Sequence, residues 1–146
     1  LSRVIPNVKA VHVPTSGCAA FTAFVSIRQT RPGEAKHAIP VVLGVDHYLK
    51  FVVIVDDDVD VFDESDVLWA LATRVQADRD VVVISGSLGA ILDPSASEQG
   101  LTAKIGIDAT RPFGQAFAEK LLMSPEKVAW ARELVDRLPI ARPDPG

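Results

Sequence analysis

The chain has 146 residues, 48% of them hydrophobic and 23% charged, which is ordinary for one globular domain. Its net charge of -4 and its pI near 5.3 argue against a broad nucleic-acid surface, which needs clustered Lys and Arg. No apolar stretch reaches the ~20 residues of a membrane helix, and a single cysteine cannot form an internal disulfide, so we expect a reducing, cytoplasmic setting.

The first third of the sequence predicts two strands and a helix. The opening residues, LSRVIPN, carry neither an initiating Met nor a signal-peptide pattern, so we expect a start that is internal to a longer product or processed. Residues 8–13 alternate apolar and polar, a turn follows at 14–17, and residues 19–27 form a second β-rich run, which favours two adjacent antiparallel strands. Residues 34–44 then predict a helix that breaks or stops early at Pro40.

The stretch 52–74, VVIVDDDVDVFDESDVLWALATR, is the most informative. Residues 51–55 are apolar throughout, which predicts a central strand covered on both faces. Asp63 is placed to cap a helix over residues 64–76, because Val67, Leu68 and Leu71 recur at helical spacing. A strand at 81–84 would complete a strand-helix-strand unit with parallel neighbours. This unit predicts the α/β class, with a mixed sheet flanked by helices.

The remaining sequence predicts a long loop and C-terminal helices. Residues 85–100 are rich in Gly, Ser, Pro and Asp and exceed the usual ~4–6 residues of a connection. A strand is expected at 102–107, and helices at 115–123 and 125–138, the second with Ser124 as N-cap and Pro125 in its first turn. The tail 139–146 is predicted to be disordered. We therefore divide the chain into an α/β domain, 1–123, and an assembly element, 124–146.

Three segments carry a resemblance to a known family. DDDVDVFDESDVLWALATR, KAVHVP near the start and GLTAKIGIDATRP further on occur in the family's order over about residues 7–112. Together they resemble the C-terminal domain of the UbiD family of decarboxylases. That family uses prenylated flavin mononucleotide (prenylated FMN) to remove, or sometimes add, a carboxylate on aromatic, heteroaromatic or α,β-unsaturated acids. Its catalytic arginine and two acidic partners lie in an upstream flavin-binding domain, so the resemblance implies a fragment or a separate subunit with no catalytic residue of its own.

The resemblance also implies a role for this domain in the enzyme. The parent enzyme would bind prenylated FMN with a divalent metal and potassium, none of which this chain would bind alone. Its partners would be the upstream flavin-binding domain or a flavin-binding subunit, a small carboxylic acid, and further copies in a homo-oligomer. The domain would supply one wall of the substrate cleft through the turn 13–15 and the loop 85–91, where Gly and Ser either leave room for a bulky acid or only form a loop. The wall candidates are Val13, Thr15, Ser85, Gly86, Ser87, Leu88 and Ile91.

The acidic cluster after residue 55 permits other interpretations. Asp56, Asp58 and Asp60 have the alternate spacing of a calcium loop, but Val61 and Val67 stand where that loop needs Gly and Glu. A phosphoacceptor pocket of a response-regulator receiver would need a further Asp at a later strand end, where residues 81–84 lead only to Ser and Gly. Helix capping and loop solvation account for the acids more simply.

The other reactive side chains predict no site. His12, His37 and His47 lie on three different predicted elements without metal spacing, and Cys18, which has no activating base, is expected to pack as a small apolar side chain. Trp69 and Trp130 are expected in core or interface packing. Three hypotheses follow: a substrate-capping domain of a flavin-dependent decarboxylase, a non-catalytic assembly module that oligomerises through its C-terminal helices, and a receiver-like signalling domain.

Overall fold

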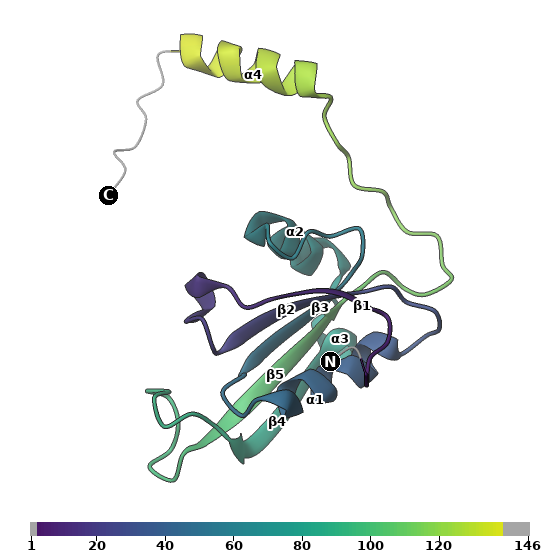
Figure 1. The fold of residues 1–146 in the computed structure, drawn as a ribbon. Helices are drawn as coiled ribbons and strands as arrows, with labels where there is room; N and C mark the ends of the chain where they lie inside the picture. The colour runs from purple at the N-terminus through teal and green to yellow at the C-terminus, as the bar shows by residue number, and fades with distance from the viewer. Residues whose placement is uncertain (1–2, 139–146) are drawn as a thin grey trace. The chain divides into compact units, whose positions relative to one another are not determined.

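The computed structural model describes residues 3–138, and the chain divides into two units, Leu1–Ala116 and Phe117–Gly146. The first unit is a five-stranded sheet with the order β1-β2-β3-β5-β4 (Figure 1). The three central strands, β2, β3 and β5, are parallel, and the two edge strands are antiparallel to their neighbours, which confirms the mixed α/β class. The strands are β1 (Val8–His12), β2 (Thr22–Ile27), β3 (Phe51–Asp56), β4 (Val81–Leu88) and β5 (Leu101–Ala109).

The predicted antiparallel pair at the start of the chain is confirmed. His12 of β1 lies opposite Phe24 of β2, and the ladder is irregular between Val8 and Ala10. A short 3-10 helix, η1 (Thr15–Gly17), joins the two strands. Cys18, which follows η1 with a φ of 59°, is exposed. The expectation that Cys18 packs as a small apolar side chain is therefore wrong, because this turn lies on the surface.

The first crossover is the unit β2-α1-β3, which gives parallel neighbours as such units normally do. Helix α1 (Glu34–Val45) continues through Pro40, so the predicted break is wrong. Pro40 itself is exposed, and the loss of one helix hydrogen bond is outweighed by a buried stripe that reaches both sides of it. That stripe consists of Ala35, Ala38, Ile39, Val42 and Leu43.

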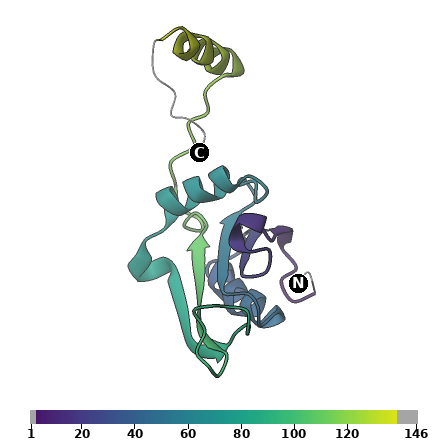
Figure 2. The same ribbon diagram turned by 90° about the vertical axis from the view of Figure 1, so that its left-hand side faces the viewer.

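The two faces of the sheet are covered by different helices. On one face, α1 packs with Val52 and Ile54 of β3, and Figure 2 shows α1 (blue) to one side of the β5 arrow (green). On the other face, α2 (Glu64–Arg74) packs with Val53 and Val55. The predicted cap is confirmed, because the Asp63 carboxylate accepts a hydrogen bond from the Ser65 amide (2.9 Å). α2 ends two residues before the predicted boundary and is followed by the short helix α3 (Ala77–Asp80).

The direction of β4 differs from the prediction. β4 runs antiparallel to β5, and β5 separates it from β3, so residues 51–55 and 81–84 are not parallel neighbours. Val81 lies opposite Ile107, and Ile107 lies opposite Val53. The chain therefore re-enters the sheet from the carboxyl side instead of crossing back to the start of β3. β4 also extends to Leu88, with an irregularity at Gly86, so the predicted loop is shortened to residues 89–100.

The second unit contains the helix α4 (Pro125–Arg137). Its predicted start is confirmed, because the Ser124 side chain accepts a bond from the Lys127 amide and Pro125 lies in the first turn. The helix expected at 115–123 is absent and those residues are largely exposed, which fits a segment without a packing partner. Within residues 3–138, no helix is long and apolar enough to cross a membrane. The predicted disorder of residues 139–146 concerns a part of the chain outside the described residues.

Candidate functional site

The carboxyl end of β3 carries a buried ionic network centred on Asp56. The Asp56 side chain is 6% exposed and accepts hydrogen bonds from Arg74 Nη1 (3.2 Å), Gln29 Nε2 (2.9 Å) and the Arg111 amide (2.6 Å). Arg74 ends α2, Gln29 follows β2 and Arg111 follows β5. One carboxylate thus joins the carboxyl ends of three parallel strands to the helix above them.

Arg74 also binds a second acid of the cluster. Its Nη1 and Nη2 donate to the two carboxylate oxygens of Asp58 (3.1 and 2.8 Å), and its guanidinium carbon lies 5.0 Å from the centre of the Trp69 ring. Burial alone raises the pKa of Asp58, but the hydrogen bond and charge of Arg74, with Arg111, outweigh burial and hold that pKa below its ordinary value. These acids therefore bind cationic side chains. Within residues 3–138, no group of three or more His, Cys, Asp or Glu is arranged to hold a metal ion.

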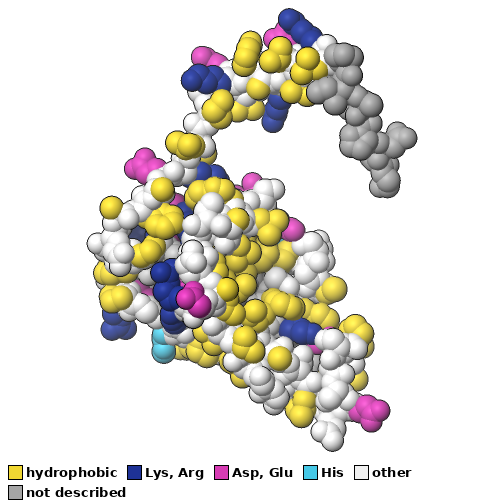
Figure 3. Space-filling model, turned by 180° about the vertical axis from the view of Figure 1, so that it is seen from behind, with side chains coloured by type: hydrophobic (Ala, Val, Ile, Leu, Met, Phe, Trp, Pro, Cys, Tyr) yellow, Lys and Arg dark blue, Asp and Glu magenta, His cyan; other side chains and the backbone are white. Residues whose placement is uncertain are grey.

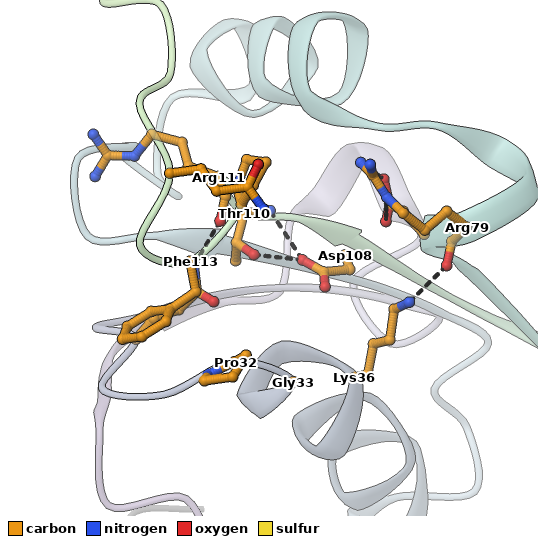
Figure 4. A pocket seen from close by; sticks show the side chains of 12 residues that line it. Pro32, Gly33, Lys36, Arg79, Asp108, Thr110, Arg111 and Phe113 are labelled. Carbon is orange, nitrogen blue, oxygen red and sulfur yellow. Dashed lines mark hydrogen bonds and ion pairs between the residues drawn. The ribbon is translucent and has the colours of Figure 1, made fainter.

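A polar pocket of about 270 Å³ opens beside this network at the carboxyl edge of the sheet (Figure 4). It lies between the first turn of α1, the short helix α3 and the residues that end and follow β5. Lys36 Nζ crosses the pocket and donates to the Arg79 carbonyl oxygen (2.8 Å), and the Arg79 guanidinium is paired with Asp80 (2.7 Å). The cations of this pocket are thus largely engaged with the protein itself.

Asp108, at the end of β5, is a partly buried acid of this pocket. One of its carboxylate oxygens accepts from both the amide (3.1 Å) and the hydroxyl (2.6 Å) of Thr110. Burial raises the pKa of Asp108, and Thr110 opposes this rise only in part. Such a carboxyl can hold or accept a proton more readily than an ordinary surface acid. Sequence reasoning missed it, because the signal is a lone Asp at the end of a strand, where capping acids are common.

The predicted wall residues lie at two margins of the sheet. Val13 and Thr15 follow the edge strand β1, whereas Ser85, Gly86, Ser87 and Leu88 belong to the opposite edge strand β4, and Ile91 lies in the loop after it. Both groups are at the amino edge of the parallel strands, because β1 and β4 run the other way. Four strand spacings separate them, about 19 Å at ~4.8 Å each. Their role in a cleft stays a prediction.

The loop 89–100 is held by a buried ion pair that the sequence did not reveal. Lys50 Nζ lies 2.8 Å from the carboxylate of Asp93, whose side chain is 6% exposed. Asp93 also accepts from the amide (2.9 Å) and hydroxyl (2.8 Å) of Ser95 and from the Thr102 hydroxyl (3.3 Å). The hydrogen bond from Lys50 and those from Ser95 hold the pKa of Asp93 well below its usual range. This arrangement fixes the loop to the start of β3 and β5.

The remaining candidate residues take structural or surface positions. His12 lies on β1 against Phe24 and Phe62, with ring centres 6.4 and 5.1 Å away, while His37 is on α1 and His47 follows it, so the three are on separate segments as predicted. Trp69 packs against the core cluster under α2, which confirms its expected packing, and Trp130 on α4 is exposed. Arg74 could have been noticed in the sequence, since it lies one turn after Ala70 on the buried stripe of α2.

The sequence of this chain matches a known protein family over most of its length. The sequence profile of the 3-octaprenyl-4-hydroxybenzoate carboxy-lyase C-terminal domain matches residues 1–109. Anhydromevalonate phosphate decarboxylase of Methanocaldococcus jannaschii is 45% identical over 109 residues, which are 74% of this chain and 26% of that protein. The enzyme of the same name from Methanothermobacter thermautotrophicus is 39% identical over 116 residues, or 80% of this chain and 27% of that protein. The chain thus spans about a quarter of the length of these relatives.

Solved structures agree with the sequence matches. The UbiD-class enzyme HmfF from Pelotomaculum thermopropionicum, in complex with FMN, superposes with a TM-score of 0.79 and 37% identity over 94% of this chain and 30% of that one. Vanillic acid decarboxylase from Sedimentibacter hydroxybenzoicus, in an open form, gives a TM-score of 0.72 and 31% identity over 94% of this chain and 31% of that one.

Proposed function

This chain belongs to the UbiD family of decarboxylases as their C-terminal domain, and from this premise we propose that it caps the substrate in a prenylated-FMN-dependent enzyme. That enzyme would remove, or in reverse add, the carboxylate of an aromatic, heteroaromatic or α,β-unsaturated acid. The observation that supports this most is the agreement of sequence profile and fold with one defined domain of flavin-containing decarboxylases. The activity would belong to the assembled enzyme, since this chain matches only 26–31% of the length of the relatives compared.

The pocket at the carboxyl edge of the sheet does not fit a flavin. The pocket at the carboxyl edge holds about 270 Å³, which is below the ~300–1,000 Å³ of ordinary ligand pockets, and its cations are paired within the protein. A glycine-rich phosphate-binding fingerprint is also absent from the sequence. We therefore assign flavin binding, with the divalent metal and potassium, to the part of the enzyme outside this match.

The contribution of this chain would be to close the cleft and exclude water. The turn at Val13 and Thr15 and the β4 margin at Ser85 to Leu88 both lie at the amino edge of the sheet. Gly86 has a φ of +63°, which favours glycine, and nothing lies within 4 Å of where its Cβ would be, so this margin leaves space beside it. The Lys50–Asp93 pair keeps the next loop in place. Water exclusion by such a wall strengthens electrostatic interactions in a site.

Assembly is the second part of the proposal and the basis of the alternative, a non-catalytic oligomerisation module. α4 exposes Trp130, Leu134 and Val135, which is unusual for a helix that serves only its own chain. HmfF has been solved in an evolved dimeric form, and vanillic acid decarboxylase in open and closed forms. We infer that this chain joins a homo-oligomer through α4, in the cytoplasm, where its single cysteine would stay reduced.

The proposal is tested on the complete enzyme, or on this chain together with its flavin-binding subunit. The enzyme is loaded with prenylated FMN and incubated with a panel of aromatic, heteroaromatic and acrylic acids, and release of CO₂ is measured against buffer. We expect release with the complete enzyme and none after residues 1–146 are removed, although the flavin stays bound. Flavin retention without CO₂ release from any acid by the complete enzyme would favour the assembly module instead.

A further inference from the structure

Half of one face of the sheet has no helix over it within the first unit. Strand register places Phe51, Ile105 and Val83 side by side, because Phe51 of β3 lies opposite Ile105 of β5, which lies opposite Val83 of β4. Leu101 and Leu88 form the next pair towards the amino edge of the parallel strands. We call these five residues the bare sheet face. They lie on the face of the sheet that carries Val53 and Val55, opposite α1.

Side-chain exposure shows where the cover ends. Val53 and Val55, at the carboxyl half of this face, are 5% and 0% exposed under α2. Two residues earlier on the same strand, Phe51 is 45% exposed, and across the sheet Val83 and Leu88 are 61% and 62% exposed. Figure 3, which views the chain from the side opposite to Figure 1, shows hydrophobic side chains gathered over the middle of this unit.

The short reach of α2 explains the gap. α2 has eleven residues and is about 16 Å long at ~1.5 Å per residue. After it, the chain enters β4 from the carboxyl side, so no helix among the described residues of the first unit runs back over the amino half of this face. Parallel strands are normally covered on both faces, and apolar patches of this kind mark interaction surfaces.

We propose that the bare sheet face is the surface on which this domain docks against the flavin-binding part of its enzyme. The inference rests on the proposed function and adds to it the face that meets the partner. Two observations favour this occupant. The matched structures carry this module as about 30% of a longer chain, so most of their polypeptide lies outside it. The bare face is also continuous with the predicted substrate wall, since Leu88 belongs to both.

The loop next to this face extends the surface. Ile91 and Leu92, which lie in the loop after β4, are 93% and 78% exposed, although Asp93, the next residue, is buried in its pair with Lys50. Aliphatic side chains held in this way by a fixed anchor can contact a partner without a large loss of loop entropy. The docking surface thus continues from β4 into the loop that bears the wall candidate Ile91.

Cysteine labelling tests which surface is covered, independently of activity. In a Cys18→Ser background, which removes the exposed native thiol, single variants Val83→Cys and Leu88→Cys report on the bare face. Val45→Cys and Leu68→Cys are matched controls, because these side chains are 63% and 64% exposed but lie at the end of α1 and on the outside of α2. Rates of modification by a small maleimide are compared between this chain alone and the complete enzyme.

We expect residues 83 and 88 to react at least tenfold more slowly in the complete enzyme than in the chain alone, and residues 45 and 68 to react equally in both. Equal rates at all four positions would overturn the proposal, even if the enzyme releases CO₂. Slow labelling of residues 83 and 88 in the chain alone would overturn it too. If deletion of residues 124–146 then made labelling faster, α4 would be the cover. If dilution made labelling faster, a second copy of the chain would be the cover. Selective protection without any decarboxylation would leave the docking face standing and refute the proposed function.

Discussion

Replacement of Arg74 by Met should destabilise the first unit by about 3 kcal/mol. The Arg74 side chain is 1% exposed and binds both Asp56 and Asp58, so the variant leaves a buried carboxylate without its main counter-charge. Breaking a buried ion pair by removing one partner typically costs about 3–5 kcal/mol. We take the lower end of that range because Asp56 keeps Gln29 and the Arg111 amide. Urea unfolding at 25 °C, followed by circular dichroism, measures the change.

An exposed ion pair in the same acidic cluster provides the control. Arg28 binds Asp57 at 2.5 Å, but its side chain is 66% exposed, so Arg28→Met should cost less than about 1 kcal/mol. The pH dependence gives a second readout. Because the folded-state pKa of Asp58 is lowered, its stabilising contribution is present above the unfolded pKa of ~3.9 and is lost as pH falls through the folded value. The difference between wild type and Arg74→Met should therefore shrink below pH ~4. An Arg74→Met protein as stable as the Arg28→Met control would refute this reasoning.

Three further predictions concern packing and assembly. Trp69→Ala should lower stability by about 2 kcal/mol, less than a fully buried Trp, and leave turnover of the complete enzyme intact below its melting temperature; lost turnover at an unchanged melting temperature would show a chemical role. Gly106→Ala should lower the free energy of unfolding by about 1–3 kcal/mol, because the added Cβ would lie 2.0 Å from Ile39 Cγ2. The double variant with Ile39→Ala should lose less stability than the two single variants summed. Strictly additive losses in urea unfolding would contradict the clash. Deletion of residues 124–146 should reduce oligomer size in light scattering and leave the circular dichroism of the sheet unchanged, whereas an unchanged assembly or a lost fold would rule out α4 as an assembly element.

Local signals in the sequence were sufficient for several elements. Asp63 and Ser124 cap their helices as predicted, because a cap depends on residues within one turn of it. The central strand at 51–55 was equally readable, since nearly every residue in it is buried. Pro40 misled the prediction because its cost is local, while the packing of Ile39 and Val42 that outweighs it depends on contacts distant in sequence.

The larger errors concern direction and partners. The antiparallel direction of β4 depends on where α2 ends and on the pairing of β4 with β5 after the loop 89–100. Neither is encoded within residues 81–84. Asp56 accepts a hydrogen bond from Arg111, which lies 55 positions away, so the acids could be recognised in the sequence but this partner could not. Lys50 and Asp93 are 43 positions apart and were missed for the same reason.

Isotope exchange distinguishes a capping domain of a reversible decarboxylase from a non-catalytic module. ¹³C-bicarbonate is incubated with candidate acids and either the complete, prenylated-FMN-loaded enzyme or this chain alone, and label in the carboxylate of the acid is followed by mass spectrometry. A capping domain of a reversible decarboxylase predicts exchange into at least one acid with the complete enzyme and none with the chain alone. Exchange catalysed by the isolated chain, or no exchange into any acid by a flavin-loaded complete enzyme, would contradict the account.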